Sequence, residues 1–523
     1  MRMQGDAYLT RIDRMVEEAR GLLMETTQPI AKLELIGSLQ HLGLDYHYDN
    51  EIRQALEELR KLGQSELGIE KHLSATSLFF RLLRQYGYDV STDVFDSFLD
   101  ETGSFKSCLC QDTRGLLSLY EASHLGFIGE VICDEAKTFT TKHLKQVLEQ
   151  GQVLDPPHLS EEIRHALELP VHYMDPRFEA RWYIEEVYEK EEHMRPSLLE
   201  LAKLDYNRLQ ALYQRNLIDM SRWWKDLGTM DKMPFIRDRI MECFLFGLGV
   251  SFEPQHQYCR DEVTKVNQLV TMVDDIYDLF GSMEELELFT DAMRRWDTDA
   301  IQNLPDYIKV CYMVLFNSIN ALAYDTLKEQ GVDVIPCLRK LWVDLCEAYL
   351  LEAKWYHSGY TPTFEEYLKN AYISISGAVV LAHGYFSMRL KVTPEVLEAL
   401  ENYHGVVLGP TKILRLCDDW STSTYELARG DVPKAVESYM NKTGASEEEA
   451  RKYVRRLIDE TWKQLNKDCI DPSPFPRTFI NGAVGLGRAS ENMYQFGDGF
   501  GRPHDSDETK NRITGLVVEP IPV

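Results

Sequence analysis

The amino-acid sequence predicts an all-α fold made of two helical domains. Apolar residues recur at helical spacing, as in Leu35, Leu39 and Leu42, which stand at i, i+4 and i+7 and so share one helix face. Alternating apolar and polar runs bounded by Asn-Gly or Asp-Gly turns, which would indicate β-hairpins, are nearly absent. The chain also shows no internal repeat of fixed period and no low-complexity tract.

The length of the chain and its helix breakers indicate where the two domains divide. A chain of 523 residues exceeds what one hydrophobic core usually holds, so two domains are expected. Proline-containing breaks fall at residues 155–157 and 195–197, and the charge run at residues 189–192 lies just before the second break. We therefore expect a non-catalytic, all-helical companion domain over residues 1–195 and a catalytic domain over residues 196–523.

The composition excludes several classes of partner. With 57 basic and 84 acidic residues the net charge is −27, which disfavours a nucleic-acid partner because phosphate backbones require clustered Lys and Arg. A small polyanion held through divalent cations is not disfavoured. The ten cysteines are scattered without a CxxC pair, which fits reduced thiols inside a cell. No stretch approaches 18 uninterrupted apolar residues, so no transmembrane helix and no membrane partner are expected.

Two acidic clusters stand out in the second half of the chain. They are Asp274-Asp275-Ile276-Tyr277-Asp278, and Asp418-Asp419-Trp420-Ser421-Thr422 continuing to Tyr425-Glu426. On a helix, residues four apart share a face, so Asp274 and Asp278 are expected to project together, and Asp418, Thr422 and Glu426 form a second stripe. Oxygen ligands of this kind suit Mg²⁺, which completes its shell with water and phosphate oxygens. The two clusters therefore predict the two walls of a magnesium–diphosphate site.

Acidic residues also gather on solvated helix faces, and either cluster taken alone could be such a face. Apolar runs lead into both clusters, at residues 269–273 and 413–417. Such runs indicate partly buried helices, where charge without a partner is costly. The presence of both clusters favours the metal site over a solvated surface.

Basic residues flank both clusters. A departing diphosphate gathers negative charge as its C–O bond breaks, so cationic donors are needed besides metal ions. Arg237 and Arg239 precede the first cluster, Arg415 lies three residues before Asp418, and Lys434 follows the second cluster. The planar guanidinium of arginine can bind two diphosphate oxygens together. Any one of these residues could form a surface ion pair, but together they favour a diphosphate site.

The ordered set of motifs resembles the class I plant terpene synthases. It comprises a DDxxD-type cluster, a (N/D)Dxx(S/T)xxxE-type cluster, an Arg-Asp-Arg tripeptide and an Arg-Gly-Asp-Val-Pro-Lys segment. The segments SRWWKDLG, GVSFEPQ, EELELFTDAMRRWD and YQFGDGFG look like the same family. The resemblance covers almost the whole chain, from about Ile30 onward, and is strongest to the angiosperm subgroup that includes monoterpene and isoprene synthases.

The resemblance implies a fold and a set of site residues. The implied fold is an N-terminal α-barrel relic and a C-terminal class I terpenoid synthase α-bundle that holds the catalytic cleft. Two Mg²⁺ ions would be bound by Asp274 and Asp278 and a third by Asp418, Thr422 and Glu426, with Mn²⁺ able to substitute. Asp275 would orient an arginine or a metal-bound water. The implied diphosphate-binding set is Arg237, Arg239, Asp274, Asp278, Arg415, Asp418 and Lys434. The absence of a DxDD motif argues against cyclisation started by protonation.

Three positions are candidates for shaping the reacting cation. Phe246 stands where that family usually carries Trp, and its ring offers a weaker π face than indole would. Asn267 lies seven residues, two turns, before Asp274, and resembles the Asn of several terpineol- and 1,8-cineole-forming enzymes. The Asn267 amide can orient one water, so a hydroxylated or cyclic-ether product is expected. The alternative for Phe246 is simple core packing, and the alternative for Asn267 is an amide held by a neighbouring backbone group. Tyr494 is a candidate for proton relay or for the core.

Small and acidic residues mark two further segments. Ser374, Ser376 and Gly377 form a small-residue break within a helical stretch, where backbone commonly opens toward a ligand. Asp498, with Tyr494, precedes the Gly-Asp-Gly-Phe-Gly turn and is expected at the rim of the cleft.

The sequence supports a Mg²⁺-dependent lyase that converts geranyl diphosphate into a monoterpene, often cyclic. The alternatives are a sesquiterpene synthase acting on farnesyl diphosphate, an isoprene synthase, a chain-elongating prenyltransferase and a helical scaffold without catalysis. The N-terminus lacks a transit-peptide pattern, so we expect a plastid location if such a peptide has been removed and a cytoplasmic one otherwise. A monomer is the default expected from the resemblance.

Overall fold

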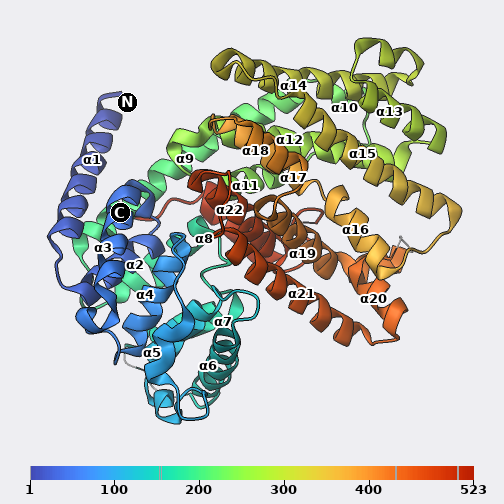
Figure 1. The fold of residues 1–523 in the computed structure, drawn as a ribbon. Helices are drawn as coiled ribbons and strands as arrows, with labels where there is room; N and C mark the ends of the chain where they lie inside the picture. Colours follow the sequence, from blue (N-terminus) through green and yellow to red (C-terminus); the bar gives the residue numbers. More distant parts are fainter. Residues whose placement is uncertain (1, 152–153, 155, 430–432, 503–505) are drawn as a thin grey trace. The chain divides into compact units, whose positions relative to one another are not determined.

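The described part of the chain is almost entirely helical, which confirms the all-α prediction (Figure 1). The computed structural model describes residues 2–151, 154, 156–429, 433–502 and 506–523, and their side chains except those of 2–7 and 423–429. Within these residues the only strand-like pairing is an isolated β-bridge between Leu99 and Phe105. The chain forms two compact units, one of residues 1–212, 469–471 and 512–523, the other of residues 213–468 and 472–511.

The first unit is built around the apolar faces that the sequence predicts. Its helices are α1 (Arg2–Glu25), α2 (Pro29–His41), α3 (Asp49–Leu67), α4 (Leu73–Gln85), α5 (Thr113–Ser123), α6 (Val131–Glu149), α7 (Leu159–Glu168), α8 (Pro176–Trp182) and the first part of α9 (Pro196–Asp226). Leu35, Leu39 and Leu42 are all buried in its core. The last helix of the chain, α23 (Asp507–Val517), ends in this unit.

The second unit is a bundle of helices that carries both acidic clusters. Its helices are α10 (Thr229–Lys232), α11 (Ile240–Val250), α12 (Gln257–Asp275), α13 (Met283–Arg295), α14 (Asp306–Gln330), α15 (Ile335–Ser358), α16 (Phe364–Ser374), α17 (Gly377–Ser387), α18 (Pro394–Glu401), α19 (Gly405–Arg429), α20 (Ala435–Thr443), α21 (Glu447–Asp468) and α22 (Arg477–Tyr494). Helix α12 packs against α11 and α17, and α19 packs against α17, α21 and α22. The two clusters therefore lie on helices that share the neighbour α17.

The expected domain division after residue 195 and the division of the compact units differ in position. Pro196 begins α9, and the unit boundary lies farther along, inside that helix. A proline at the first turn of a helix gives up only an N–H that has no helical partner, so it can start a helix as readily as a linker. The domain ranges 1–195 and 196–523 stay predictions.

The helix break predicted from Ser374, Ser376 and Gly377 is confirmed. Helix α16 starts at a capping box formed by Thr363 and Glu366 and ends at Ser374, and α17 begins at Gly377. Between them Ser376 adopts φ +67°, which is uncommon for a residue with a side chain. A Cβ on Gly377 would lie 2.6 Å from Thr411 Oγ1, so the close packing of α17 on α19 requires glycine here.

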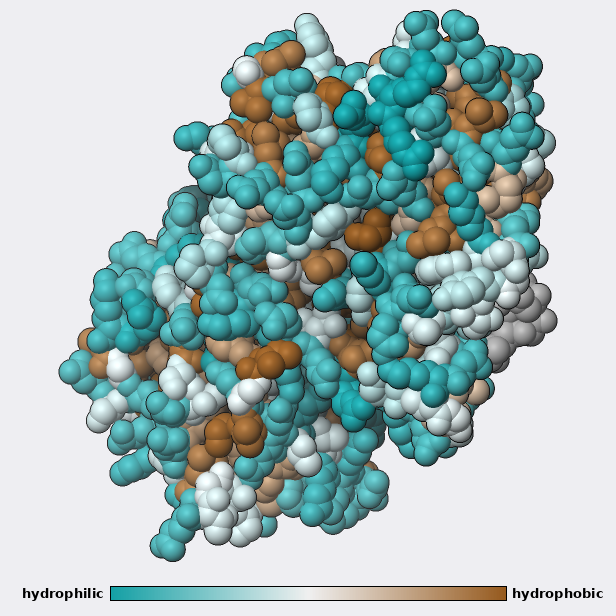
Figure 2. Space-filling model, turned by 45° about the vertical axis from the view of Figure 1, so that its right-hand side comes forward, coloured by the Kyte–Doolittle hydropathy of each residue, from teal (hydrophilic) through white to brown (hydrophobic). Residues whose placement is uncertain are grey.

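The visible surface is mostly polar. Figure 2 shows a face that is mainly hydrophilic, with hydrophobic residues in small separate patches. Among the helices the structure describes, none combines the length and apolar character needed to cross a bilayer.

Candidate functional site

The first acidic cluster lies where α12 changes its winding. The α-helix ends at Asp275, and residues Ile276–Phe280 form a π turn, η7. A π turn holds more residues than an α turn, so the backbone between Asp274 and Asp278 departs from regular α-helical winding. That the two carboxylates project together stays a prediction. The two carboxylates are still close enough for Asp274 to raise the pKa of Asp278. The apolar run that leads into this cluster, residues 269–273, is buried as predicted.

Arg237, in the loop before α11, is held by the first two aspartates. The carboxylate of Asp275 is fully buried and accepts hydrogen bonds from the backbone N of Arg237 at 2.8 Å and from its Nε at 2.6 Å. Arg237 Nη2 donates to Asp274 Oδ2 at 2.6 Å. Burial raises the pKa of Asp275 while Arg237 lowers it, and both carboxylates raise the pKa of Arg237 against the effect of burial. Asp275 thus holds an arginine, which is one of the two roles that the resemblance implies for it.

Asp278 lies among charges of both signs. Its side chain is accessible to solvent, yet the surrounding protein raises its pKa by desolvation first, and Asp274 and Glu352 raise it further. Lys434 and Arg237 act in the opposite direction. Desolvation and the neighbouring carboxylates thus disfavour the ionised form of Asp278, and a bound divalent cation would favour it.

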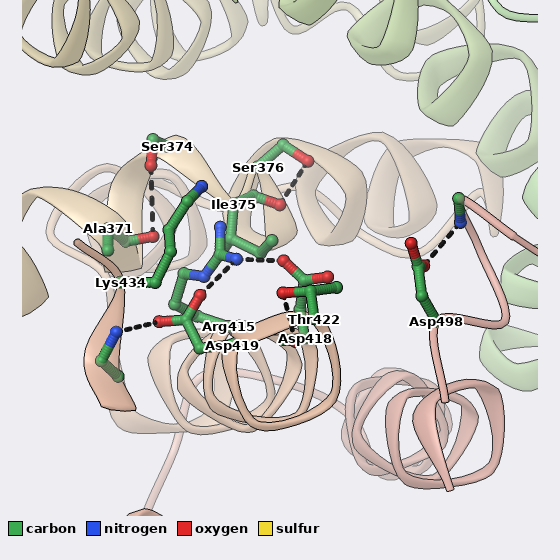
Figure 3. Close-up of polar contacts among 12 residues, drawn as sticks. Ala371, Ser374, Ile375, Ser376, Arg415, Asp418, Asp419, Thr422, Lys434 and Asp498 are labelled. Carbon is green, nitrogen blue, oxygen red and sulfur yellow. Dashed lines mark hydrogen bonds and ion pairs between the residues drawn. The ribbon is translucent and has the colours of Figure 1, made fainter. Parts of the chain in front are cut away.

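The second cluster lies on α19, which runs without interruption from Gly405 to Arg429. The backbone spacing predicted for Asp418, Thr422 and Glu426 therefore holds, although the side chain of Glu426 lies outside the described residues. Thr422 Oγ1 donates to the carbonyl of Asp418 at 2.9 Å. Asp418 and Asp419 both point to the guanidinium of Arg415, which forms ion pairs with each of them (Figure 3).

Asp498 connects the surroundings of the two clusters. Desolvation raises the pKa of Asp498, Asp418 raises it further, and Arg237 and Arg239 lower it, so residues from both sides lie within electrostatic reach. Asp498 Oδ1 accepts a hydrogen bond from the backbone N of Gly501 at 2.6 Å, and the carbonyl of Gly501 accepts one from Arg239 Nη2 at 2.9 Å. Arg239 is thereby tied to the turn that follows α22.

Tyr494, at the end of α22, belongs to the same group of side chains. It is buried, and its pKa is raised by desolvation first and then by Asp418 and Asp498, with a hydrogen bond to Asp418 contributing. The phenol thus lies within electrostatic reach of both the metal-ligand candidate of α19 and the acid of the following turn. This arrangement keeps Tyr494 a candidate for proton relay.

The two other cavity candidates have satisfied local contacts. Phe246 on α11 is buried and packs against Phe500, with ring centroids 6.0 Å apart. Asn267 is partly buried, and its Nδ2 donates to the Val263 carbonyl one turn earlier at 2.8 Å. The backbone-bound amide foreseen for Asn267 is therefore present, and its Oδ1 is the group that can receive a hydrogen bond from water.

Glu352 is a charged neighbour of the site that sequence reasoning missed. Its Oε1 accepts hydrogen bonds from Ser374 Oγ at 2.7 Å and from Asn370 Nδ2 at 3.0 Å. It lies on α15, within electrostatic reach of Asp278. A single glutamate at the end of an apolar helical stretch carries no spacing signal, so only the packing of α15 beside η7 reveals it.

The available ligands fit a cation for which the protein supplies only part of the coordination shell. Among the described side chains, no group of three or more His, Cys, Asp or Glu converges as it would around an ion held by protein alone. Mg²⁺ does not need such a group, since it is bound through one or two carboxylates and otherwise by water and phosphate oxygens. Carboxylates beside Arg237, Arg415 and Lys434 suit a metal–diphosphate complex of this kind.

Comparisons with known proteins agree with this chemistry. A family model described as "Terpene synthase family, metal binding domain" matches residues 225–464, and one described as "Terpene synthase, N-terminal domain" matches residues 2–167. A (-)-alpha-terpineol synthase of Vitis vinifera is 50% identical over 99% of this chain and 87% of its own. A chloroplastic alpha-thujene synthase of Litsea cubeba is 48% identical over 97% of this chain and 86% of its own.

A solved structure gives a similar result. It is an isoprene synthase from grey poplar leaves in complex with three Mg²⁺ ions and dimethylallyl-S-thiolodiphosphate. It is 43% identical, with a TM-score of 0.91, covering 99% of this chain and 98% of that one.

Proposed function

This chain belongs to the terpene synthase family, and from that premise we propose that it is a metal-dependent lyase that converts geranyl diphosphate into a monoterpene. Its family and its similarity to monoterpene synthases support an enzyme that acts on a prenyl diphosphate. One observation carries the proposal: Arg237 pairs with Asp274 of the first cluster and lies within electrostatic reach of Asp498, which is also within reach of Asp418 of the second cluster.

The residues proposed to hold the metal ions are Asp274 and Asp278 on one side, and Asp418, Thr422 and Glu426 on the other. We propose Mg²⁺, three ions in number as in the grey poplar isoprene synthase complex, with Mn²⁺ able to substitute. When bound, such ions neutralise charge that develops on the departing diphosphate. Glu352 adds a further carboxylate beside Asp278.

The cationic side chains are proposed to bind the diphosphate oxygens. Arg237, Arg415 and Lys434 each interact with an acidic residue of a cluster, so the carboxylates that hold the metal also orient these cations. Preorganised charge of this kind needs no rearrangement as the C–O bond breaks. Arg239, bound to the Gly501 carbonyl, is proposed to hold the turn after α22 over the site and so exclude water.

Apolar and neutral polar residues are proposed to control how the carbocation reacts after the diphosphate departs. Phe246 offers a π face that can stabilise positive charge without reacting with it. Asn267 is proposed to orient one water through Oδ1, which would give an alcohol or a cyclic ether. Tyr494, which forms a hydrogen bond with Asp418, is proposed to receive or return a proton.

The cellular location and the oligomeric state of the chain are also proposals. The chloroplastic name of the Litsea cubeba relative supports a plastid location. A monomer is proposed as the default that the family resemblance implies. A small-molecule prenyl diphosphate is the partner that the site requires.

The deciding experiment is headspace product analysis with the C5, C10 and C15 allylic diphosphates in parallel, with and without Mg²⁺. The proposal expects volatile C10 products and released diphosphate from geranyl diphosphate, and the loss of both when EDTA removes the metal. Turnover confined to farnesyl or dimethylallyl diphosphate would make the chain a sesquiterpene or isoprene synthase. Longer prenyl diphosphates formed with added isopentenyl diphosphate would make it a prenyltransferase.

A further inference from the structure

Asp419, the second acid of the α19 cluster, has contacts unlike those of its neighbour Asp418. Its side chain is fully buried, and Oδ2 accepts hydrogen bonds from Tyr367 Oη at 2.8 Å and from the backbone N of Ala435 at 3.1 Å. Oδ1 lies 2.5 Å from Arg415 Nη2 (Figure 3). Hydrogen bonds and an ion pair offset the cost of burying such a carboxylate. Asp419 therefore joins three elements, α16, α19 and α20.

The contacts of Asp419 reach both cations of this side of the site. Arg415 is bound directly, and it pairs with Asp418 at the same time. Ala435, the first residue of α20, directly follows Lys434, whose charge lowers the pKa of Asp278 in the opposite cluster. Fixing the backbone at Ala435 thus limits where Lys434 can extend, while the ion pair fixes the plane of Arg415.

Tyr367 on α16 is the side chain that holds Asp419 from the far side. The tyrosine is 2% exposed, so its hydroxyl has no ready exchange with water, and Asp419 is its acceptor. Without this donor, Oδ2 would lose one of its hydrogen bonds, and the carboxylate could rotate toward Arg415. Such a rotation would shift the guanidinium and release the start of α20 together.

We propose that Tyr367 and Asp419 form a positioning pair that aligns Arg415 and Lys434 for capture of the diphosphate group. This inference rests on the proposed function, because it assigns those two cations to the diphosphate. Neither Tyr367 nor Asp419 touches the diphosphate in this scheme. Both act through the residues that do, and the pair couples the two cations so that they are placed together.

The test uses Tyr367→Phe, which removes one hydroxyl and keeps the ring. The matched control is Tyr385→Phe on α17, a buried tyrosine of the same unit whose hydroxyl donates to the Lys391 carbonyl at 2.6 Å instead. Both variants and the wild type are titrated with inorganic pyrophosphate in the presence of Mg²⁺ by calorimetry. Turnover of geranyl diphosphate and the melting temperature without ligands are measured alongside.

The expected result is that Tyr367→Phe binds pyrophosphate about tenfold more weakly, since loss of a hydrogen bond to a charged group is worth roughly one factor of ten or more. Tyr385→Phe should bind as the wild type does. Asp419→Asn, which keeps an acceptor for Tyr367 but loses the charge facing Arg415, should lose more affinity than Tyr367→Phe.

Two outcomes overturn the inference in distinguishable ways. A wild type that neither binds pyrophosphate nor releases it from geranyl diphosphate overturns the proposed function and the positioning pair with it. A wild type that does both, while Tyr367→Phe keeps its affinity or loses no more than Tyr385→Phe does, overturns the positioning pair alone. The comparison of the two tyrosine variants separates positioning from a general loss of packing.

Discussion

The orientation of Arg237 by Asp275 gives the sharpest single prediction, and Asp275→Asn is the variant that tests it. The amide can still accept the hydrogen bond from the Arg237 backbone through its oxygen. Its NH₂ then faces Nε, which is also a donor, so the 2.6 Å hydrogen bond is lost. Arg237 keeps its hydrogen bond to the carboxylate of Asp274 and turns toward it.

The size of the effect follows from the burial of the two partners. A hydrogen bond to a charged group contributes about 1.5–3 kcal/mol, and removing one partner of a fully buried ion pair costs about 3–5 kcal/mol. The Arg237 side chain is 36% exposed while Asp275 is not exposed, so solvent screening favours the lower range. A loss of about 2 kcal/mol in the binding of the departing diphosphate would slow turnover about 30-fold.

The assay is release of inorganic diphosphate from geranyl diphosphate at saturating Mg²⁺, with a melting curve for each variant. Asp261→Asn is the matched control, because Asp261 is a partly buried aspartate on the same helix, its pKa raised to about 6 mainly by burial, and it contacts neither cluster arginine. Wild-type turnover in Asp275→Asn, or an equal loss in Asp261→Asn, would refute the orienting role.

Three further results are expected. The pKa of Asp278 is raised by desolvation and by Asp274 and Glu352. On acidification, metal binding and turnover should therefore be lost at a pH above about 3.9, the ordinary pKa of an aspartate. The stability of the metal-free protein should change with pH in the opposite direction. A carboxyl whose pKa is raised in the folded state stabilises that state at low pH, and this stabilisation is lost as the pH rises through the raised pKa. The melting temperatures in EDTA and in Mg²⁺ should therefore diverge toward neutral pH. A constant gap would contradict this. Glu352→Gln keeps the acceptor for Ser374 and should raise the Mg²⁺ concentration needed for half-maximal turnover about tenfold; an unchanged requirement would limit Glu352 to anchoring α16. Asn267→Ile should remove alcohol or ether products in favour of hydrocarbons by headspace analysis, and an identical product spectrum would end the water-orienting proposal.

Local sequence patterns predicted the helical fold and the break at Ser376 because both are properties of neighbouring residues. Helical periodicity depends on which side chains repeat every three or four positions, and a break depends on the residues at the break. The burial of residues 269–273 and 413–417 followed from the same kind of pattern. The π turn at Ile276–Phe280 was not predicted from these patterns, because they assume regular α-helical winding through the cluster.

The sequence by itself determined that this chain is helical and that it carries two acidic clusters flanked by arginines and a lysine. Only the tertiary structure decided which charges meet: Arg237 with Asp275, Glu352 with Asp278, and Asp498 between Asp418 and Arg237. The physical reason is the range of the interactions. Helix formation is settled within a few residues, whereas the energy of a charge depends on partners and burial that distant helices supply only when they pack.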